Sequence, residues 1–95
     1  MALSPLPPMR LDLFLKLSRL CPRRTLAQKL CDAGIVFLNG RSAKPAHEVK
    51  AGDEIAIRKA DEEVVARVLN VPSTSNVSRQ QSKELIEIVG RNRRG

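Results

Sequence analysis

Residues 9–34 read MRLDLFLKLSRLCPRRTLAQKLCDAG, and this stretch contains two runs of helical spacing separated by a proline. In the first run, the apolar residues fall on one broad face of a helix: Leu11, Phe14, Leu15, Leu17 and Leu20. Pro22 has no backbone N–H and disfavours helical geometry at the residue before it, so we expect the first helix to end at Cys21. The polar stripe of this helix is expected to consist of Asp12, Lys16 and Arg19.

The second run begins at Pro22, which suits the first position of a helix because its missing N–H would be unpaired there in any case. Gly34 is well placed to end this helix, since glycine adopts positive φ at little cost. The buried face is predicted to contain Leu26, Ala27, Leu30 and Cys31. The residues expected to face outward are Arg23, Arg24, Gln28, Lys29 and Asp32. The whole stretch therefore predicts two short helices with a tight corner between them.

Beyond Gly34 the pattern changes from that of helices to that of short strands. Residues 35–38, IVFL, form a β-type run, and Asn39-Gly40 after them is a strong hairpin signal because both residues tolerate positive φ. Pro45 weakens the returning strand. Residues 49–58 predict a Gly-Asp turn that leads into another strand. Residues 61–63 are interpreted as a turn, and residues 64–71 as a further strand.

The two ends of the chain differ in composition from the middle. Residues 1–8, MALSPLPP, are rich in proline and are interpreted as a disordered leader, without the charged start of a secretory signal. Residues 72–95 are predicted to be a flexible basic tail, in which KELIEIVG could form one or two helical turns. Residues 9–71 would then be one small domain. The sequence contains no run of 18 apolar residues, so no membrane span is predicted.

The charge of the chain is strongly positive and unevenly distributed. The net charge is +7 at 95 residues. Residues 1–44 carry eight Lys or Arg against two Asp, residues 45–71 have a net charge of −2, and residues 72–95 a net charge of +3. Such a distribution favours a polyanionic partner, either nucleic acid or an acidic membrane surface, over an ordinary protein that happens to be basic.

Metal binding and catalysis are disfavoured by the residue patterns. Cys21 and Cys31 are separated by nine residues and lack the close pairing of structural zinc sites. Cys31 fits the core, whereas Cys21 at a helix start could have a pKa lowered by the helix dipole and the nearby arginines. His47 has no nucleophile or carboxylate pattern around it, and no Walker loop or dinucleotide turn is present. We expect no enzyme, no cofactor, no metal, and two free thiols in a reducing cytoplasm.

The arginines give a more specific indication. Arg23 and Arg24 fall in the first turn of the second helix, where backbone N–H groups are unpaired and the helix dipole is positive. A phosphate would stabilise this arrangement by accepting from both the N–H groups and the guanidinium forks. Phe14 and Phe37 are the only aromatic residues, and both lie in apolar patterns. Because base stacking on exposed aromatics is not available, binding by phosphates and shape is expected, as for structured RNA or, more weakly, duplex DNA.

The run MRLDLFLKLSRL, followed by RRTLAQKLCDAGIVFLNGRSAKPAHEVKAGDEIAI, resembles the S4 RNA-binding domain of a ribosomal protein family. The family pattern RLD-x-FL, a basic second helix that ends in glycine, V-x-x-NG and V-x-x-GD-x-I are matched between Arg10 and Ile57. This resemblance implies an α+β fold in which two N-terminal helices pack on a small, bent antiparallel β-sheet, the alpha-L motif. It also implies that Asp12 could hold an arginine by a salt bridge.

The same resemblance implies the residues that contact RNA. From the helices these are Arg10, Lys16, Arg19, Arg23, Arg24 and Lys29, and from the edge of the hairpin Asn39, Gly40, Arg41 and Lys44. Among them, Arg23 and Arg24 are the residues already indicated by their place in the first turn of the second helix.

Among stand-alone members of the family, the chain is most similar to small bacterial factors of ribosome-associated quality control. This similarity implies a monomer that binds rRNA and tRNA on obstructed large ribosomal subunits and assists a partner, RqcH, in extending the nascent chain with alanine. Two alternatives stay open. One is a heat-shock-type factor that recycles free large subunits with nascent chains. The other is a subunit that delivers an RNA-modifying enzyme, with residues 64–71 and 83–89 as the partner surface.

Overall fold

The computed structural model describes residues 9–72 and 76–93. In chain order its elements are β1 (Met9–Arg10), α1 (Leu11–Leu17), α2 (Arg24–Asp32), β2 (Val36–Leu38), β3 (Arg41–Ser42), β4 (Glu48–Val49), β5 (Glu54–Arg58), β6 (Glu62–Val68), α3 (Arg79–Lys83) and β7 (Ile86–Arg93). Five strands form an antiparallel sheet in the order β3-β2-β5-β6-β7, and β1 pairs with β4 separately. This confirms the predicted α+β fold.

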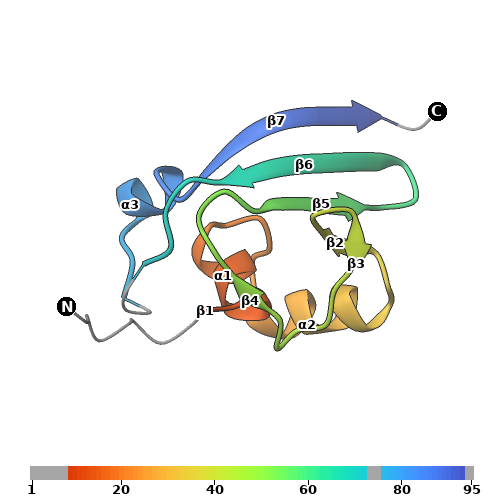
Figure 1. Cartoon of the computed structure of the whole chain (residues 1–95), viewed down its shortest axis with the longest axis horizontal. Coiled ribbons are helices and arrows are strands. Elements are labelled where there is room, and N and C mark those ends of the chain that lie inside the picture. The colour runs from red at the N-terminus through yellow and green to blue at the C-terminus, as the bar shows by residue number, and fades with distance from the viewer. Residues whose placement is uncertain (1–8, 73–75, 94–95) are drawn as a thin grey trace.

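The helices α1 and α2 lie on one side of the sheet, and α3 lies at the end of β6 where β7 begins (Figure 1). The largest fully buried side chains of α1 are Phe14, Leu11 and Leu15, which share one core cluster with the sheet residues Ile55, Val36 and Val68. The strand residues alternate as expected, since Val36 and Leu38 pair with Ile57 and Ile55 on the buried face. Burial of this shared apolar surface fixes the helix pair to the sheet.

The corner between α1 and α2 is longer than the sequence suggested, because residues 18–23 lie outside both helices and the first helix was expected to continue to Cys21. α1 ends at Leu17, and Arg19 adopts a left-handed backbone conformation with φ of 65°. The Cys21 N–H then donates to the carbonyl of Leu15, which closes the corner. Pro22 was expected at the first helical position, but α2 begins at Arg24 because Arg23 is the extended N-cap residue. Leu26, expected in the buried face, is 37% exposed.

The predicted turns of the sheet are present. Asn39 and Gly40 both have positive φ, 53° and 86°, as the hairpin between β2 and β3 requires. The strand that follows the Gly52-Asp53 turn is β5. Residues 61–63 were expected to be a turn, yet β6 already begins at Glu62. Glu63 pairs with Arg58 on β5, and the side chains of these two residues form a 2.7 Å salt bridge.

The segment from residue 76 to residue 93 is folded, so the prediction of a flexible tail is wrong there. α3 begins with a capping box in which Ser78 and Gln81 exchange hydrogen bonds. β7 then pairs with β6 from Ile86 to Arg93 with one bulge at Val89, and Leu85 between α3 and β7 is buried in the core. The folded unit therefore continues beyond residue 71.

The apolar residues of KELIEIVG explain this difference. Ile86, Ile88 and Val89 belong to β7, which covers the free edge of β6. Lys83 ends α3 and Glu84 is its C-cap, and Leu85 lies between the two elements. The two segments predicted as an alternative partner surface, residues 64–71 and 83–89, are joined in the sheet, because residues 66–68 pair with residues 86–88. The proposed leader, residues 1–8, lies outside the described residues. No helix in the described part of the chain is long and apolar enough to cross a membrane.

Candidate nucleic-acid interface

Asp12 is the centre of the polar contacts between α1 and α2. Its side chain is fully buried. Oδ1 accepts from the backbone N–H of Leu13 at 2.7 Å and from Nε of Arg10 at 3.2 Å. Oδ2 accepts from Nη2 of Arg10 at 3.2 Å, from Nε of Arg24 at 3.3 Å and from Nε2 of Gln28 at 2.9 Å. One carboxylate thus holds two arginines, where the sequence analysis anticipated one and placed Asp12 on an outward stripe.

The surroundings of Asp12 keep it ionised. Burial alone raises the pKa of a carboxyl group, but the hydrogen bonds from Gln28, Arg10, Arg24 and the Leu13 N–H together outweigh that cost. The pKa of Asp12 is therefore held below its ordinary value of 3.8. The negative charge is compensated by two guanidinium groups whose side chains are 48% and 41% exposed. The cluster consequently presents positive charge to solvent and negative charge to the interior.

Gln28 is the member of this cluster that the sequence analysis missed as a functional residue. It had been assigned to the outward face of the second helix. A signal for it was available, because Gln28 follows Arg24 by four residues and so lies on the same side of α2. A buried acid on α1 that needs several donors can reach both side chains at once.

The other cations of the two helices surround the cluster as exposed side chains. Lys16, Arg23 and Lys29 are exposed, and within residues 9–72 and 76–93 no carboxylate forms an ion pair with them. Arg19 is exposed as well, but its Nε donates to the hydroxyl of Ser82 at 3.0 Å. Arg19 therefore contacts α3, which the sequence did not indicate.

The N-terminus of α2 fits the expected phosphate geometry. Its N-cap residue, Arg23, makes no side-chain capping hydrogen bond, and the first turn contains no acidic residue. The N–H groups of that turn can therefore donate to an anion beside Arg23 and Arg24. The start of α1 differs, because the N–H groups of Leu11 and Asp12 donate to the carbonyls of His47 and Pro45 at 2.8 and 3.1 Å.

The hairpin residues divide into two places. Residues 45–48 lie against the start of α1, through these hydrogen bonds and the pairing of Arg10 with Glu48. Lys44, which is exposed, directly precedes this segment and is therefore on the Arg10 side of the molecule. Gly40 and Arg41 are exposed at the turn between β2 and β3. That hairpin lies near the end of α2, where a Cβ on Gly34 would be 3.9 Å from Ser42 Oγ. The turn is thus separated from Arg24 by about the 13 Å length of a nine-residue helix.

The side chain of Asn39 connects the β2–β3 hairpin to the rest of the sheet. Its Nδ2 donates to Asp53 Oδ1 at 3.1 Å, and its Oδ1 accepts from the N–H of Glu54 at 2.9 Å. These bonds fix the hairpin to the beginning of β5. Of the predicted hairpin residues, Arg41 and Lys44 are the ones whose charged side chains are available for a phosphate.

The two thiols are buried, and the pKa of each is raised. Cys21 is 1% exposed, and burial raises its pKa against the opposing effect of Lys59, so the prediction of a lowered pKa is wrong. Cys21 lies in the core three residues before α2 begins, and burial is the largest influence on its pKa. Burial, with smaller contributions from Asp12, Cys21 and Asp32, raises the pKa of Cys31 to about 11. Both cysteines are free, as predicted.

Comparison with known proteins matches both the sequence and the fold. The profile of the S4 domain matches residues 9–55. A protein of Halalkalibacterium halodurans named RQC P-site tRNA stabilizing factor is 44% identical over 80 residues, which cover 84% of this chain and 89% of the relative. A protein of the same name from Bacillus subtilis is 45% identical over 67 residues, 70% of this chain and 78% of the relative.

Solved structures agree with this match. The trimeric structure of heat shock protein 15 from Vibrio cholerae has a TM-score of 0.76 at 26% identity, covering 87% of this chain and 83% of that chain. Because both comparisons extend well beyond residue 55, the similarity includes the C-terminal elements as well as the helices and the hairpin.

Proposed function

This chain belongs to the family of RQC P-site tRNA stabilizing factors, which carry an S4 domain, and we propose that it binds tRNA and rRNA on obstructed large ribosomal subunits. The name of its relatives describes a stabilizing factor and not a catalyst, in agreement with a non-enzymatic RNA-binding protein. In this proposal, chemistry stays with the ribosome, and the factor contributes binding energy and position.

The observation that carries the proposal is the pair of arginines on Asp12. A guanidinium group that is already fixed by a carboxylate loses little conformational freedom when it binds a phosphate. Arg10 and Arg24 are fixed in this way while about half of each side chain remains exposed. Two such groups beside an uncapped helix start suit neighbouring phosphates of a folded RNA.

The proposed interface consists of this pair and the cations around it. From the helices we include Arg10, Lys16, Arg19, Arg23, Arg24 and Lys29, and from the hairpin Asn39, Gly40, Arg41 and Lys44. Asn39 and Gly40 would contribute mainly through the shape of the turn, since the amide of Asn39 is bound to Asp53 and Glu54. Because affinity would come from phosphate contacts, it should fall steeply as salt is added.

On the ribosome, the factor would hold a peptidyl-tRNA in place while the nascent chain is extended. We propose a cytoplasmic monomer that supports RqcH in adding alanine to stalled chains. Two basic areas on one small domain are suited to this task. The area around Arg24 and the turn around Arg41, separated by the length of α2, could contact two RNA segments at once.

A second candidate function has one observation in its favour. The similarity to heat shock protein 15 covers 87% of this chain, and a factor of that type would recycle free large subunits with nascent chains. Both candidates share the same RNA-binding surface. They differ in whether the bound subunit goes on to receive alanine.

The experiment that tests the proposal is sedimentation of lysate from cells that express the tagged protein, at low and at high salt. We expect the protein to migrate with free large subunits that carry tRNA at low salt, and to be released at high salt. Alanine tails on the nascent chains of that fraction, which disappear when the gene is deleted, would favour quality control over recycling. Migration at the top of the gradient, or with small subunits, would contradict both candidates.

A further inference from the structure

A pocket of about 400 Å³ lies where the chain turns from α1 to α2. We call it the corner pocket. Lys16, Leu17 and Arg19 form its α1 side, Pro22 lies on the α2 side, and Asn76 and Val77 close it from the C-terminal segment. It therefore exists only because the segment before α3 folds back onto the helices. The sequence analysis, which treated this segment as a flexible tail, could not have found it.

Positive charge is concentrated at the rim of the corner pocket. Lys16 and Arg19 are both exposed there. The guanidinium group of Arg19 is also held in orientation, because its Nε donates to Ser82 Oγ at 3.0 Å and that hydroxyl donates to the carbonyl of Arg79 at 2.7 Å. The left-handed backbone of Arg19, with φ of 65°, directs the side chain toward α3. An arginine fixed through Nε retains its terminal nitrogens for a ligand.

Four of the seven residues that line the corner pocket are apolar, beside the polar Lys16, Arg19 and Asn76. Leu17 and the thiol of Cys21 are 7% and 1% exposed, and Pro22 and Val77 complete the apolar surface. The thiol is neutral, since burial raises the pKa of Cys21. A flat, uncharged group can therefore enter between these walls while an anionic group attached to it remains at the rim. A nucleotide has this distribution of polarity.

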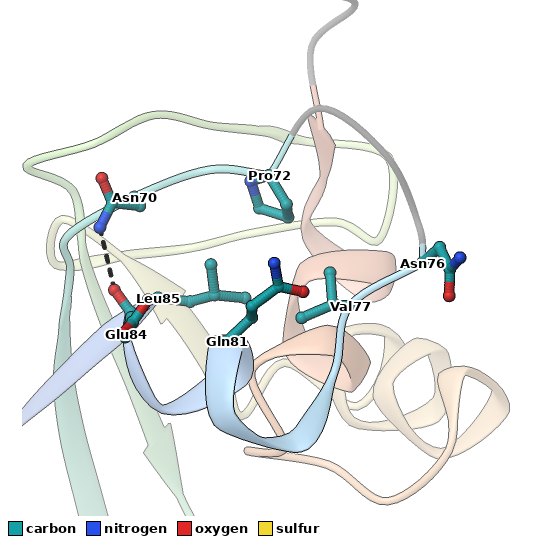
Figure 2. Close-up of a pocket in the computed structure, with 7 residues that line it drawn as sticks. All are labelled: Asn70, Pro72, Asn76, Val77, Gln81, Glu84 and Leu85. Atoms are coloured by element: carbon teal, nitrogen blue, oxygen red, sulfur yellow. Dashed lines mark hydrogen bonds between the residues drawn. The ribbon is translucent and has the colours of Figure 1, made fainter.

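A neighbouring hollow of about 300 Å³ gives a contrast (Figure 2). It shares Asn76 and Val77 with the corner pocket and lies on the other side of them, against Gln81, Glu84 and Leu85. Seven described residues line it, among them the acidic Glu84, and none of the seven is a lysine or arginine. An anion is disfavoured there, so the charge at the rim distinguishes the corner pocket from the adjacent one.

We propose that the corner pocket binds one unstacked nucleotide of the RNA, with its base between Pro22 and Val77 and its phosphate between Lys16 and Arg19. The inference rests on the proposed function and specifies which feature of the RNA is recognised. Unpaired bases that leave the stack are the usual targets of sequence-dependent RNA recognition. Here the apolar side chains of Pro22 and Val77 would contact the base in place of an aromatic ring. This accounts for RNA recognition by a chain without exposed aromatic residues.

The test uses the full chain and two RNA hairpins with the same stem and loop, one fully paired and one with a single bulged 2-aminopurine. Fluorescence anisotropy gives the affinity for each hairpin, and 2-aminopurine fluorescence reports whether the base has left the stack. We expect the bulged hairpin to bind about tenfold more tightly, which corresponds to about 1.4 kcal/mol, within the range measured for one stacked base. The bulged base should change its fluorescence on binding.

Two variants separate the corner pocket from the rest of the surface. Val77→Phe fills the pocket without changing charge, and it should abolish the preference for the bulge while the affinity for the paired hairpin stays the same. Lys16→Gln, an exposed change, should reduce the preference through loss of the phosphate contact. Equal binding of both hairpins by the unaltered protein, or a preference retained in both variants, would overturn the inference alone. Failure to bind either hairpin would overturn the proposed function with it.

Discussion

Oδ2 of Asp12, a fully buried carboxylate on α1, lies 3.3 Å from Nε of Arg24, the first residue of α2. This contact joins the two helices and also orients a cation that faces solvent. The same carboxylate holds Arg10. The carboxylate that stabilises the helix corner therefore also orients two arginines of the proposed RNA-binding surface.

Asp12→Asn should weaken RNA binding although it makes the protein more positive. The amide cannot accept from both arginines as a carboxylate does, so their orientation is lost, and we expect the free energy of unfolding to fall by about 2 kcal/mol. Urea denaturation measures stability, and anisotropy with a structured RNA measures affinity at fixed salt. If net charge alone governed binding, the variant would bind more tightly, which would contradict the role assigned to Asp12.

The stability of the protein should decrease in acid because of Asp12. Its pKa is lower in the folded protein than the ordinary 3.8, so the unfolded chain takes up a proton first as the pH falls. The contribution of Asp12 is thus complete above the unfolded pKa and is lost as the pH falls through the folded pKa. Urea denaturation at about pH 6 and about pH 3 should show a smaller decrease for Asp12→Asn than for the unaltered protein. An identical decrease in both proteins would contradict this assignment.

Both thiols should be protected from modification while the protein is folded. The pKa of each is raised by burial, that of Cys31 to about 11, so little thiolate is present near neutral pH. A thiol-reactive disulfide reagent should react slowly with the native protein and quickly in urea. Rapid reaction of either cysteine under native conditions would contradict the burial of that thiol.

Leu85→Ala should destabilise the domain by about 2–4 kcal/mol, because it removes buried methyl groups from the shared core. Leu69→Ala is a matched control, since that leucine is 43% exposed and contacts Leu85 by a backbone hydrogen bond that the substitution leaves in place. We expect the control to change stability by about 0.5 kcal/mol or less. Equal effects in urea denaturation would mean that α3 and β7 are not part of the cooperative unit.

The helices and the hairpin could be predicted from local signals. Leu11, Phe14 and Leu15 repeat at helical spacing and are buried as expected, and Asn39-Gly40 determines a turn through its own backbone preference. Each of these features depends on residues close together in the chain. These elements could therefore be predicted locally, whereas the fold class was implied by the resemblance to the S4 domain, which the structure confirms.

The features that depend on distant residues could not be predicted in the same way. The apolar residues of 85–89 suit a helix as well as a strand, and the free edge of β6 decides in favour of β7. Asp12 has the spacing of an exposed stripe, but Arg10, Arg24 and Gln28 together make its burial favourable. The contact of Arg19 with Ser82 joins positions 63 residues apart. The corner pocket follows from that same long-range packing.

The most direct test of the proposed interface compares Arg24→Ala with Arg67→Ala in binding to large ribosomal subunits that carry peptidyl-tRNA. Each variant removes one half-exposed arginine, and Arg67 lies on β6, where its 3.8 Å contact with Glu87 is the only ion pair that the described residues give it. Arg10 and Gln28 still satisfy Asp12 in Arg24→Ala, so folding should be retained. We predict at least about a tenfold loss of subunit affinity for Arg24→Ala and little change for Arg67→Ala. Equal affinities for the two variants would contradict the assignment of the Asp12 cluster as the RNA-binding surface.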